Sequence, residues 1–134
     1  MKSAIAGIGL DVVEIGRVAR LLSGPAGERF MDRVLTVRER AAARGMAEKR
    51  LVQYVAGRFA LKEAVAKALG CGIGSLVGFR DIEAVPDELG KPCCSLSEEA
   101  LGRLGLTGRP PRLHVAITHE RSLAAATALL EREL

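Results

Sequence analysis

The longest periodic segment of the sequence, residues 47–69, constrains the fold more than any other feature. Large apolar side chains recur through it at helical spacing, and Gly70 follows where a helix commonly ends. Alanine dominates its second half, so neighbouring elements can approach the backbone of this predicted helix closely. The chain has 134 residues, which suits a single domain over residues 1–134 with the long helix packed against other elements.

The rest of the chain alternates between helical and extended patterns. Thr36 with Glu39 three residues later is a capping box, and Ser97 is a second N-cap. We expect helices over residues 14–22, 28–35, 36–44 and 97–104 and strands over residues 3–10, 79–85, 92–96 and 113–118. Residues 123–130 are ambiguous, because their alanines favour a helix by propensity. Helices that mostly precede strands predict an α+β fold.

Charge is distributed unevenly along the chain. The net charge is +4, but residues 1–70 hold thirteen basic and seven acidic residues, a net +6, and the remainder carries −2. A basic first half suggests a phosphate, an acidic protein or nucleic acid as partner, and the alternative is a solvated helical surface. Three Phe, one Tyr and no Trp argue against a base-stacking platform for nucleic acid.

Targeting and redox features indicate a reduced, intracellular setting. No apolar stretch is long enough to cross a bilayer, and Asp11 and Glu14 interrupt the apolar N-terminal run that would otherwise resemble a signal peptide. Cys71, Cys93 and Cys94 lack a zinc-binding spacing and are expected to be reduced thiols. We therefore expect a cytoplasmic protein that does not span a membrane.

Several polar residues are candidates for chemistry. Asp11, at the expected end of the first strand, would face solvent, cap the next helix or bind a cation. Glu63 and Lys67 share a helix face through their i,i+4 spacing, which favours an ordinary ion pair or, among small alanines, a ligand site. The backbone amides of Gly70 and Gly72, in the loop after the long helix, can approach a phosphate.

Three sequence blocks, taken together, are similar to one protein family. The blocks are residues 7–17 (GIGLDVVEIGR), 57–74 (GRFALKEAVAKALGCGIG) and 115–119 (VAITH). Their composition, order and spacing resemble the bacterial holo-acyl-carrier-protein synthases, the small trimeric class of phosphopantetheinyl transferases. The resemblance implies a 4′-phosphopantetheinyl transferase-like fold, with a small antiparallel sheet, a long central helix and a strand over residues 123–130. Two positions depart from the family pattern, since Ala116 replaces a serine and Leu123 an aromatic residue.

The reaction that the resemblance implies moves the 4′-phosphopantetheine arm of coenzyme A to a serine of an apo-acyl carrier protein. By resemblance, Asp11 and Glu63 bind Mg²⁺ and Lys67 contacts the pyrophosphate. Two carboxylates with phosphate and water suit Mg²⁺, and the cation neutralises charge on the reacting phosphate oxygens. The acceptor of the serine proton stays open between a water on the metal and Glu63 itself. The carrier would serve fatty-acid, polyketide or peptide synthesis.

The resemblance also implies two binding surfaces. Coenzyme A contacts are assigned to Lys49, Arg50, Arg58, Gly70, Gly72 and His119, in a site between the subunits of a homotrimer. Docking of the acidic carrier protein is assigned to Arg17, Leu21, Arg29 and Arg33. These arginines would account for the basic first half of the chain, and they predict salt-sensitive association.

A second interpretation is a non-catalytic basic module that binds an acidic protein or RNA. It would explain the arginines, but it would leave Asp11 and Glu63 without a purpose. Mg²⁺-dependent turnover of coenzyme A separates the two interpretations.

Overall fold

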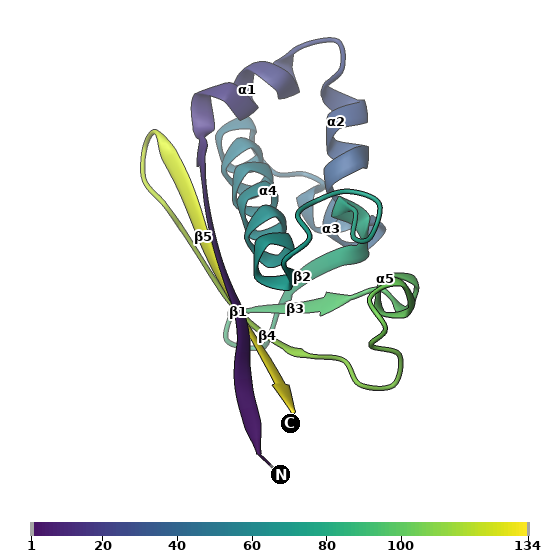
Figure 1. Cartoon of the computed structure of the whole chain (residues 1–134). Coiled ribbons are helices and arrows are strands. Elements are labelled where there is room, and N and C mark those ends of the chain that lie inside the picture. Colours follow the sequence, from purple (N-terminus) through teal and green to yellow (C-terminus); the bar gives the residue numbers. More distant parts are fainter. Residues whose placement is uncertain (1, 134) are drawn as a thin grey trace.

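The computed structural model describes residues 2–133, and its larger sheet joins the two ends of the chain. β1 (Ser3–Glu14), β5 (Leu123–Glu133) and β4 (Arg112–His119) form an antiparallel sheet in the order β1-β5-β4 (Figure 1). β2 (Ile82–Pro86) and β3 (Pro92–Leu96) form a separate antiparallel hairpin. The first strand of the chain thus pairs with the last along its whole length.

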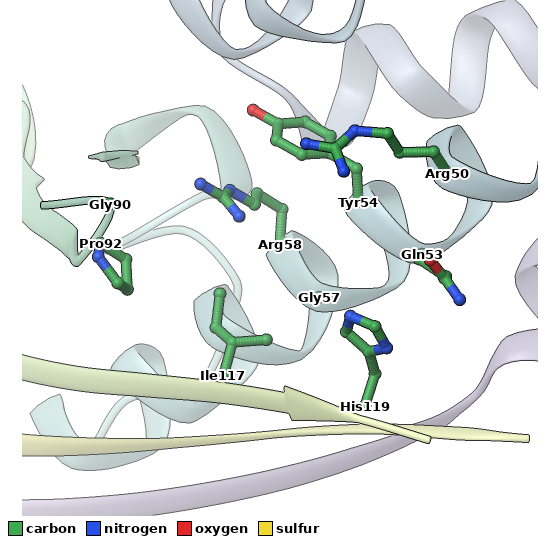
Figure 2. A pocket seen from close by; sticks show the side chains of 9 residues that line it. All are labelled: Arg50, Gln53, Tyr54, Gly57, Arg58, Gly90, Pro92, Ile117 and His119. Atoms are coloured by element: carbon green, nitrogen blue, oxygen red, sulfur yellow. The ribbon is translucent and has the colours of Figure 1, made fainter. Parts of the chain in front are cut away.

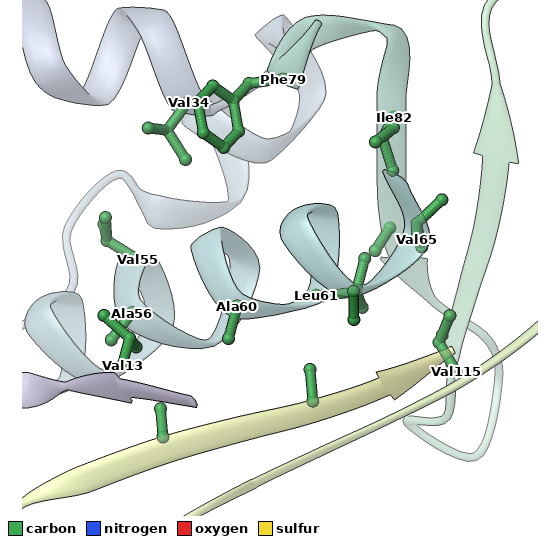
Figure 3. Close-up of a cluster of buried hydrophobic side chains, with 14 of the residues drawn as sticks. Val13, Val34, Val55, Ala56, Ala60, Leu61, Val65, Phe79, Ile82 and Val115 are labelled. Carbon is green, nitrogen blue, oxygen red and sulfur yellow. The ribbon is translucent and has the colours of Figure 1, made fainter. Parts of the chain in front are cut away.

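The long helix α4 (Glu48–Leu69) lies across one face of the three-stranded sheet (Figures 1 and 3). Its inward side chains, which include Leu61, are fully buried. β5 turns a row of small side chains towards the helix, because Ala124, Ala126 and Ala128 alternate with residues on the outer face. Small residues on both surfaces bring the helix and the sheet close together.

Shorter helices complete the described chain, namely α1 (Ile15–Ser23), α2 (Gly27–Val34), α3 (Val37–Ala43) and α5 (Glu98–Arg103). The predicted capping box is confirmed, since the Thr36 amide donates to Glu39 Oε1 at 2.8 Å and the Glu39 amide donates to Thr36 Oγ1 at 3.3 Å. The Ser97 hydroxyl likewise caps α5. No helix within residues 2–133 has the length and apolar character needed to cross a membrane.

The predicted α+β class is confirmed, but two boundaries are wrong. β1 does not end at Asp11, because its pairing with β5 continues as far as Glu14. The strand expected from residue 79 begins instead with a short 3₁₀ helix, η1 (Phe79–Asp81), before β2. The ambiguous residues 123–130 form a strand despite their alanines, as the family resemblance implied. Here tertiary packing under α4 overrides helix propensity.

Candidate active site

Asp11, Glu63 and Lys67 meet where β1 crosses α4. Successive residues of a strand face opposite sides, so Asp11 shares the α4-facing side of β1 with Gly9. Lys67 Nζ lies 3.1 Å from Asp11 Oδ1 and donates a second hydrogen bond to the Leu10 carbonyl oxygen at 3.1 Å. Glu63 lies one turn before Lys67 on the same helix. The structure thus brings together three residues that are up to 56 positions apart in the chain.

The surroundings of Glu63 disfavour its negative charge. Burial raises the pKa of this carboxyl above its ordinary value, the Asp11 carboxylate raises it further, and the Lys67 ammonium lowers it. A cation close to both carboxylates would relieve this repulsion.

The donor set formed by Asp11 and Glu63 fits Mg²⁺. Within residues 2–133, no group of three or more His, Cys, Asp or Glu side chains is placed to hold a metal ion. Mg²⁺ does not need such a group, because it commonly takes one or two protein carboxylates and completes its coordination with phosphate and water. Two carboxylates beside a lysine therefore suit a metal that is shared with a phosphorylated substrate.

Glu63 also lines a groove of about 480 Å³ bordered by α1, α2 and α4. Arg17, Leu21 and Arg33 line the same groove, so three of the four predicted docking residues lie beside the predicted catalytic carboxylate. Arg29, the fourth, is exposed on α2 and does not line the groove. The groove combines a basic edge with an apolar wall.

Three aromatic rings form part of that wall. Phe59 stacks between Phe30 and Phe79, with ring centroids 6.1 Å and 5.2 Å away, and all three side chains line the groove. The rings come from α2, α4 and η1. No spacing in the sequence connects residues of three separate elements, so sequence reasoning had no signal for this cluster.

A second pocket, of about 270 Å³, lies between α4, the end of β4 and the β2–β3 hairpin (Figure 2). Arg50, Arg58 and His119, three of the residues assigned to coenzyme A, line it. The rest of its lining consists of Gln53, Tyr54, Gly57, Gly90, Pro92 and Ile117. Tyr54 lines this pocket but is not among the residues that the sequence assigned to coenzyme A.

Arg58 is the most constrained cation of this pocket. Its guanidinium carbon lies 4.5 Å from the centroid of the Tyr54 ring, one helical turn earlier, and an Nη2–H donates to the Ala84 carbonyl oxygen at 3.3 Å. The Arg58 Nε is buried without a hydrogen-bond partner. A buried donor without an acceptor is costly. The i,i+4 spacing of Tyr54 and Arg58 was the available sequence signal.

The other assigned residues lie apart from these two cavities. Lys49 is exposed at the start of α4, whereas Gly70 and Gly72 lie beyond its opposite end with φ values of 86° and 67°. Neither cavity is lined by any of these three residues. Asp11, Glu63 and Lys67, in turn, do not line the pocket around Arg58. Within one chain, the carboxylates and the basic pocket therefore form separate surfaces.

The chain is similar in sequence and in fold to known proteins. The family model of the 4′-phosphopantetheinyl transferase superfamily matches residues 7–128. A holo-[acyl-carrier-protein] synthase of Bacillus mycoides is 42% identical over 127 residues, which cover 95% of this chain and 96% of that protein. The crystal structure of a Bacillus anthracis holo-(acyl-carrier-protein) synthase in complex with CoA (3′,5′-ADP) has a TM-score of 0.81 and 40% identity, over 96% of this chain and 98% of that one. The Helicobacter pylori holo-[acyl-carrier-protein] synthase, solved with coenzyme A, has a TM-score of 0.77 and 29% identity, over 92% and 98% of the two chains.

Proposed function

The chain belongs to the 4′-phosphopantetheinyl transferase superfamily, and we propose that it transfers the 4′-phosphopantetheine group of coenzyme A to a serine of an apo-acyl carrier protein. The serine oxygen attacks the pyrophosphate phosphorus next to the pantetheine arm and forms a new phosphorus–oxygen bond. The bond from that phosphorus to the bridging oxygen breaks, and adenosine 3′,5′-bisphosphate leaves. The serine proton passes to a base at the reaction centre, so the products are holo-acyl carrier protein and the bisphosphate.

The main support for the proposal is that Glu63 and most of the predicted docking residues line the same groove. Arg17 and Arg33 border the same cavity as this carboxylate, and Leu21 adds an apolar contact. An acidic carrier protein held by these arginines would present its serine next to Glu63. The exposed Arg29, on the same helix as Arg33, would extend the basic edge.

The reaction centre in this proposal is formed by Asp11, Glu63 and Lys67. The two carboxylates would hold Mg²⁺, which when bound neutralises charge on the pyrophosphate oxygens. Lys67 pairs with Asp11, and its exposed ammonium would contact an incoming phosphate. Glu63 or a water at the reaction centre would accept the serine proton.

The pocket around Arg58 would bind the nucleotide end of coenzyme A. Arg50, Arg58 and His119 would supply positive charge or hydrogen bonds for its phosphates. Lys49 lies beside Arg50 at the start of α4 and would add a cation. The amides of Gly70 and Gly72 remain candidates for a phosphate contact in this proposal.

A homotrimer would bring the two separate surfaces of the chain together. β1 turns Ile8, Leu10 and Val12 outward, with exposed fractions of 73%, 57% and 54%. An apolar sheet face of this kind favours coverage by a partner. In the proposed trimer, the outer faces of the sheets meet and each basic pocket lies next to the carboxylates of a neighbouring subunit. The proposal places the protein in the cytoplasm, which is supported by its three free cysteines.

Mass spectrometry of an apo-acyl carrier protein tests the proposal directly. After incubation with this protein, coenzyme A and Mg²⁺, the carrier should gain the mass of one phosphopantetheine, and EDTA should prevent the gain. No gain with carriers of fatty-acid, polyketide and peptide synthesis would reject the transferase function. Binding of an acidic protein or RNA without turnover would instead support the non-catalytic basic module.

A further inference from the structure

A fully buried ion pair joins α3 to α4 in the core of the protein. Lys62 and Glu39 have no exposed side-chain surface, and Lys62 Nζ lies 2.5 Å from Glu39 Oε1. The ammonium also donates to the carbonyl oxygen of Val34 at 2.5 Å. A buried ion pair is weak evidence for stability by itself, because removing both charges from water is expensive. The pair is therefore expected to have a role other than stability.

The Glu39 carboxylate joins three elements through its two oxygens. Oε1 accepts from Lys62 of α4 and from the Thr36 amide at the start of α3 at 2.8 Å, and Oε2 accepts from the Ala84 amide of β2 at 2.9 Å. Both oxygens are thus used, and each contact comes from a different element. The carboxylate fixes α4 relative to the β2–β3 hairpin.

One branch of this network reaches the pocket around Arg58. Ala84 donates its amide to Glu39 and accepts from Arg58 with its carbonyl oxygen. The Tyr54 hydroxyl donates to the Glu39 carbonyl oxygen at 3.4 Å, and the Tyr54 ring stacks on Arg58. Tyr54, Arg58 and Lys62 are spaced four residues apart, so they form one row along α4. Glu39 contacts that row at Tyr54 and Lys62, and it reaches Arg58 through Ala84.

The buried pair also affects the direction of Glu63, the residue that follows Lys62. Consecutive side chains of an α-helix are rotated by about 100° around its axis. Because Lys62 is held in the core by Glu39 and Val34, that rotation directs Glu63 towards the groove and Asp11. The buried pair fixes the rotation of α4 about its own axis. It therefore also fixes the direction in which the proposed catalytic carboxylate points.

We infer that the Glu39–Lys62 pair positions both parts of the active site, holding Arg58 for the nucleotide and Glu63 for the reaction centre. The inference rests on the proposed function. Neither residue opens onto the two cavities, so both act through Arg58, Ala84 and Glu63 rather than on the substrate. A buried network in which both carboxylate oxygens of Glu39 are hydrogen-bonded is well suited to holding one geometry.

Two substitutions at Glu39 test this role. Glu39→Gln replaces one carboxylate oxygen by an NH₂ group, which cannot accept a hydrogen bond. The single oxygen that remains cannot serve both Ala84 and Lys62, which use different oxygens of Glu39. Glu39→Asp keeps the charge beside Lys62, so it is the variant more certain to fold, but its shorter side chain cannot hold both partners. The matched control is Leu101→Ala, which removes a buried side chain from α5 and lines neither cavity. Turnover would be measured below the melting temperature of every variant, together with calorimetric binding of adenosine 3′,5′-bisphosphate.

We expect both Glu39 variants to bind the bisphosphate about tenfold more weakly and to lower kcat, as outer partners of binding groups do when removed. Leu101→Ala should lose stability but keep kcat, KM and bisphosphate affinity. Wild-type kcat and bisphosphate affinity in both folded Glu39 variants would overturn the inference. A further comparison uses Lys62→Met, which leaves Glu39 buried without its partner, and the double variant Glu39→Gln/Lys62→Met, which removes both charges. If the double variant regained both stability and kinetics relative to Lys62→Met, the inference would also be overturned. If the wild-type protein shows no turnover, the proposed function fails, and the bisphosphate affinities alone decide on the pair.

Discussion

A Cβ atom on Gly9 would lie 1.9 Å from the carbonyl oxygen of Ala64, a separation that real Cβ atoms essentially never show. β1 therefore lies directly against the backbone of α4, with no side chain between them. Gly7 makes the same approach to Ala68, also at 1.9 Å. Because Asp11 follows Gly9 on the same face of the strand, this contact sets the separation between Asp11 and the carboxylate of Glu63.

Replacement of Gly9 by alanine should damage both the fold and the active site. The added methyl group must push β1 away from α4, at a cost of about 1–3 kcal/mol in the free energy of unfolding. Turnover should fall as well, because Asp11 moves with the strand. Urea denaturation and a turnover assay measure the two effects. Gly74→Ala is the control, since a Cβ there meets nothing within 4 Å and should change stability by less than about 0.5 kcal/mol.

Glu63→Gln should abolish turnover without unfolding the protein. Removal of a proposed Mg²⁺ ligand should lower kcat by at least about 100-fold. Burial and Asp11 disfavour the charged form of Glu63, so the neutral amide should leave the melting temperature unchanged or raise it. Turnover at saturating Mg²⁺ and circular dichroism provide the measurements. Glu48→Gln, at the exposed start of the same helix, should behave like the wild type, and near-normal turnover in Glu63→Gln would contradict the assignment.

Arg17→Glu should weaken recognition of the carrier protein alone. Reversal of a charge at the rim of the groove should raise KM for the carrier by about tenfold and leave KM for coenzyme A unchanged. The wild-type KM for the carrier should also rise with salt, because exposed charge pairs are screened. Steady-state kinetics with each substrate varied in turn measure both effects. Arg109→Glu, in an exposed loop outside the groove, controls for net charge; an effect on coenzyme A only would refute the docking role.

Asp81 should make the fold sensitive to acid. Burial raises its pKa, but hydrogen bonds from the Ser97 hydroxyl and Gly78 amide, together with Arg103, bring the pKa below the ordinary 3.8. The unfolded chain therefore binds the proton more readily, and the stability that Asp81 contributes is complete above about pH 4 and lost as the pH falls through the folded pKa. Asp81→Asn should be less stable by about 1–3 kcal/mol near pH 7.

Urea denaturation of the wild type and Asp81→Asn over a range of pH checks this assignment. The difference in unfolding free energy should shrink as the pH falls below the ordinary pKa. A constant difference across the range would show that the lost hydrogen bonds, and not the ionisation of Asp81, account for the effect. Arg103→Gln should show a smaller loss of the same sign, because the Ser97 and Gly78 partners remain.

Local signals in the sequence predicted the helices well. The Thr36–Glu39 capping box, the Ser97 cap and the glycine after α4 depend on residues within one turn of each other, so spacing alone reveals them. The family blocks likewise indicated Asp11, Glu63 and Lys67, which the structure brings together.

Long-range contacts decided what local patterns missed. Lys62 occupies an inward position of the α4 pattern, yet nothing near it in sequence identifies Glu39 as its partner. The stack of Phe30, Phe59 and Phe79 is assembled from three elements in the same way.

The sequence by itself determined where most elements begin and end, because capping, glycine conformation and side-chain period act over a few residues. Its resemblance to one family supplied the candidate residues for the chemistry. Only the tertiary structure decided that β1 continues past Asp11 and that a 3₁₀ helix precedes β2. It also placed Glu63 in one groove with Arg17. These outcomes depend on pairing and packing between segments far apart in the chain, whose free energy exceeds the small local preferences that the sequence displays.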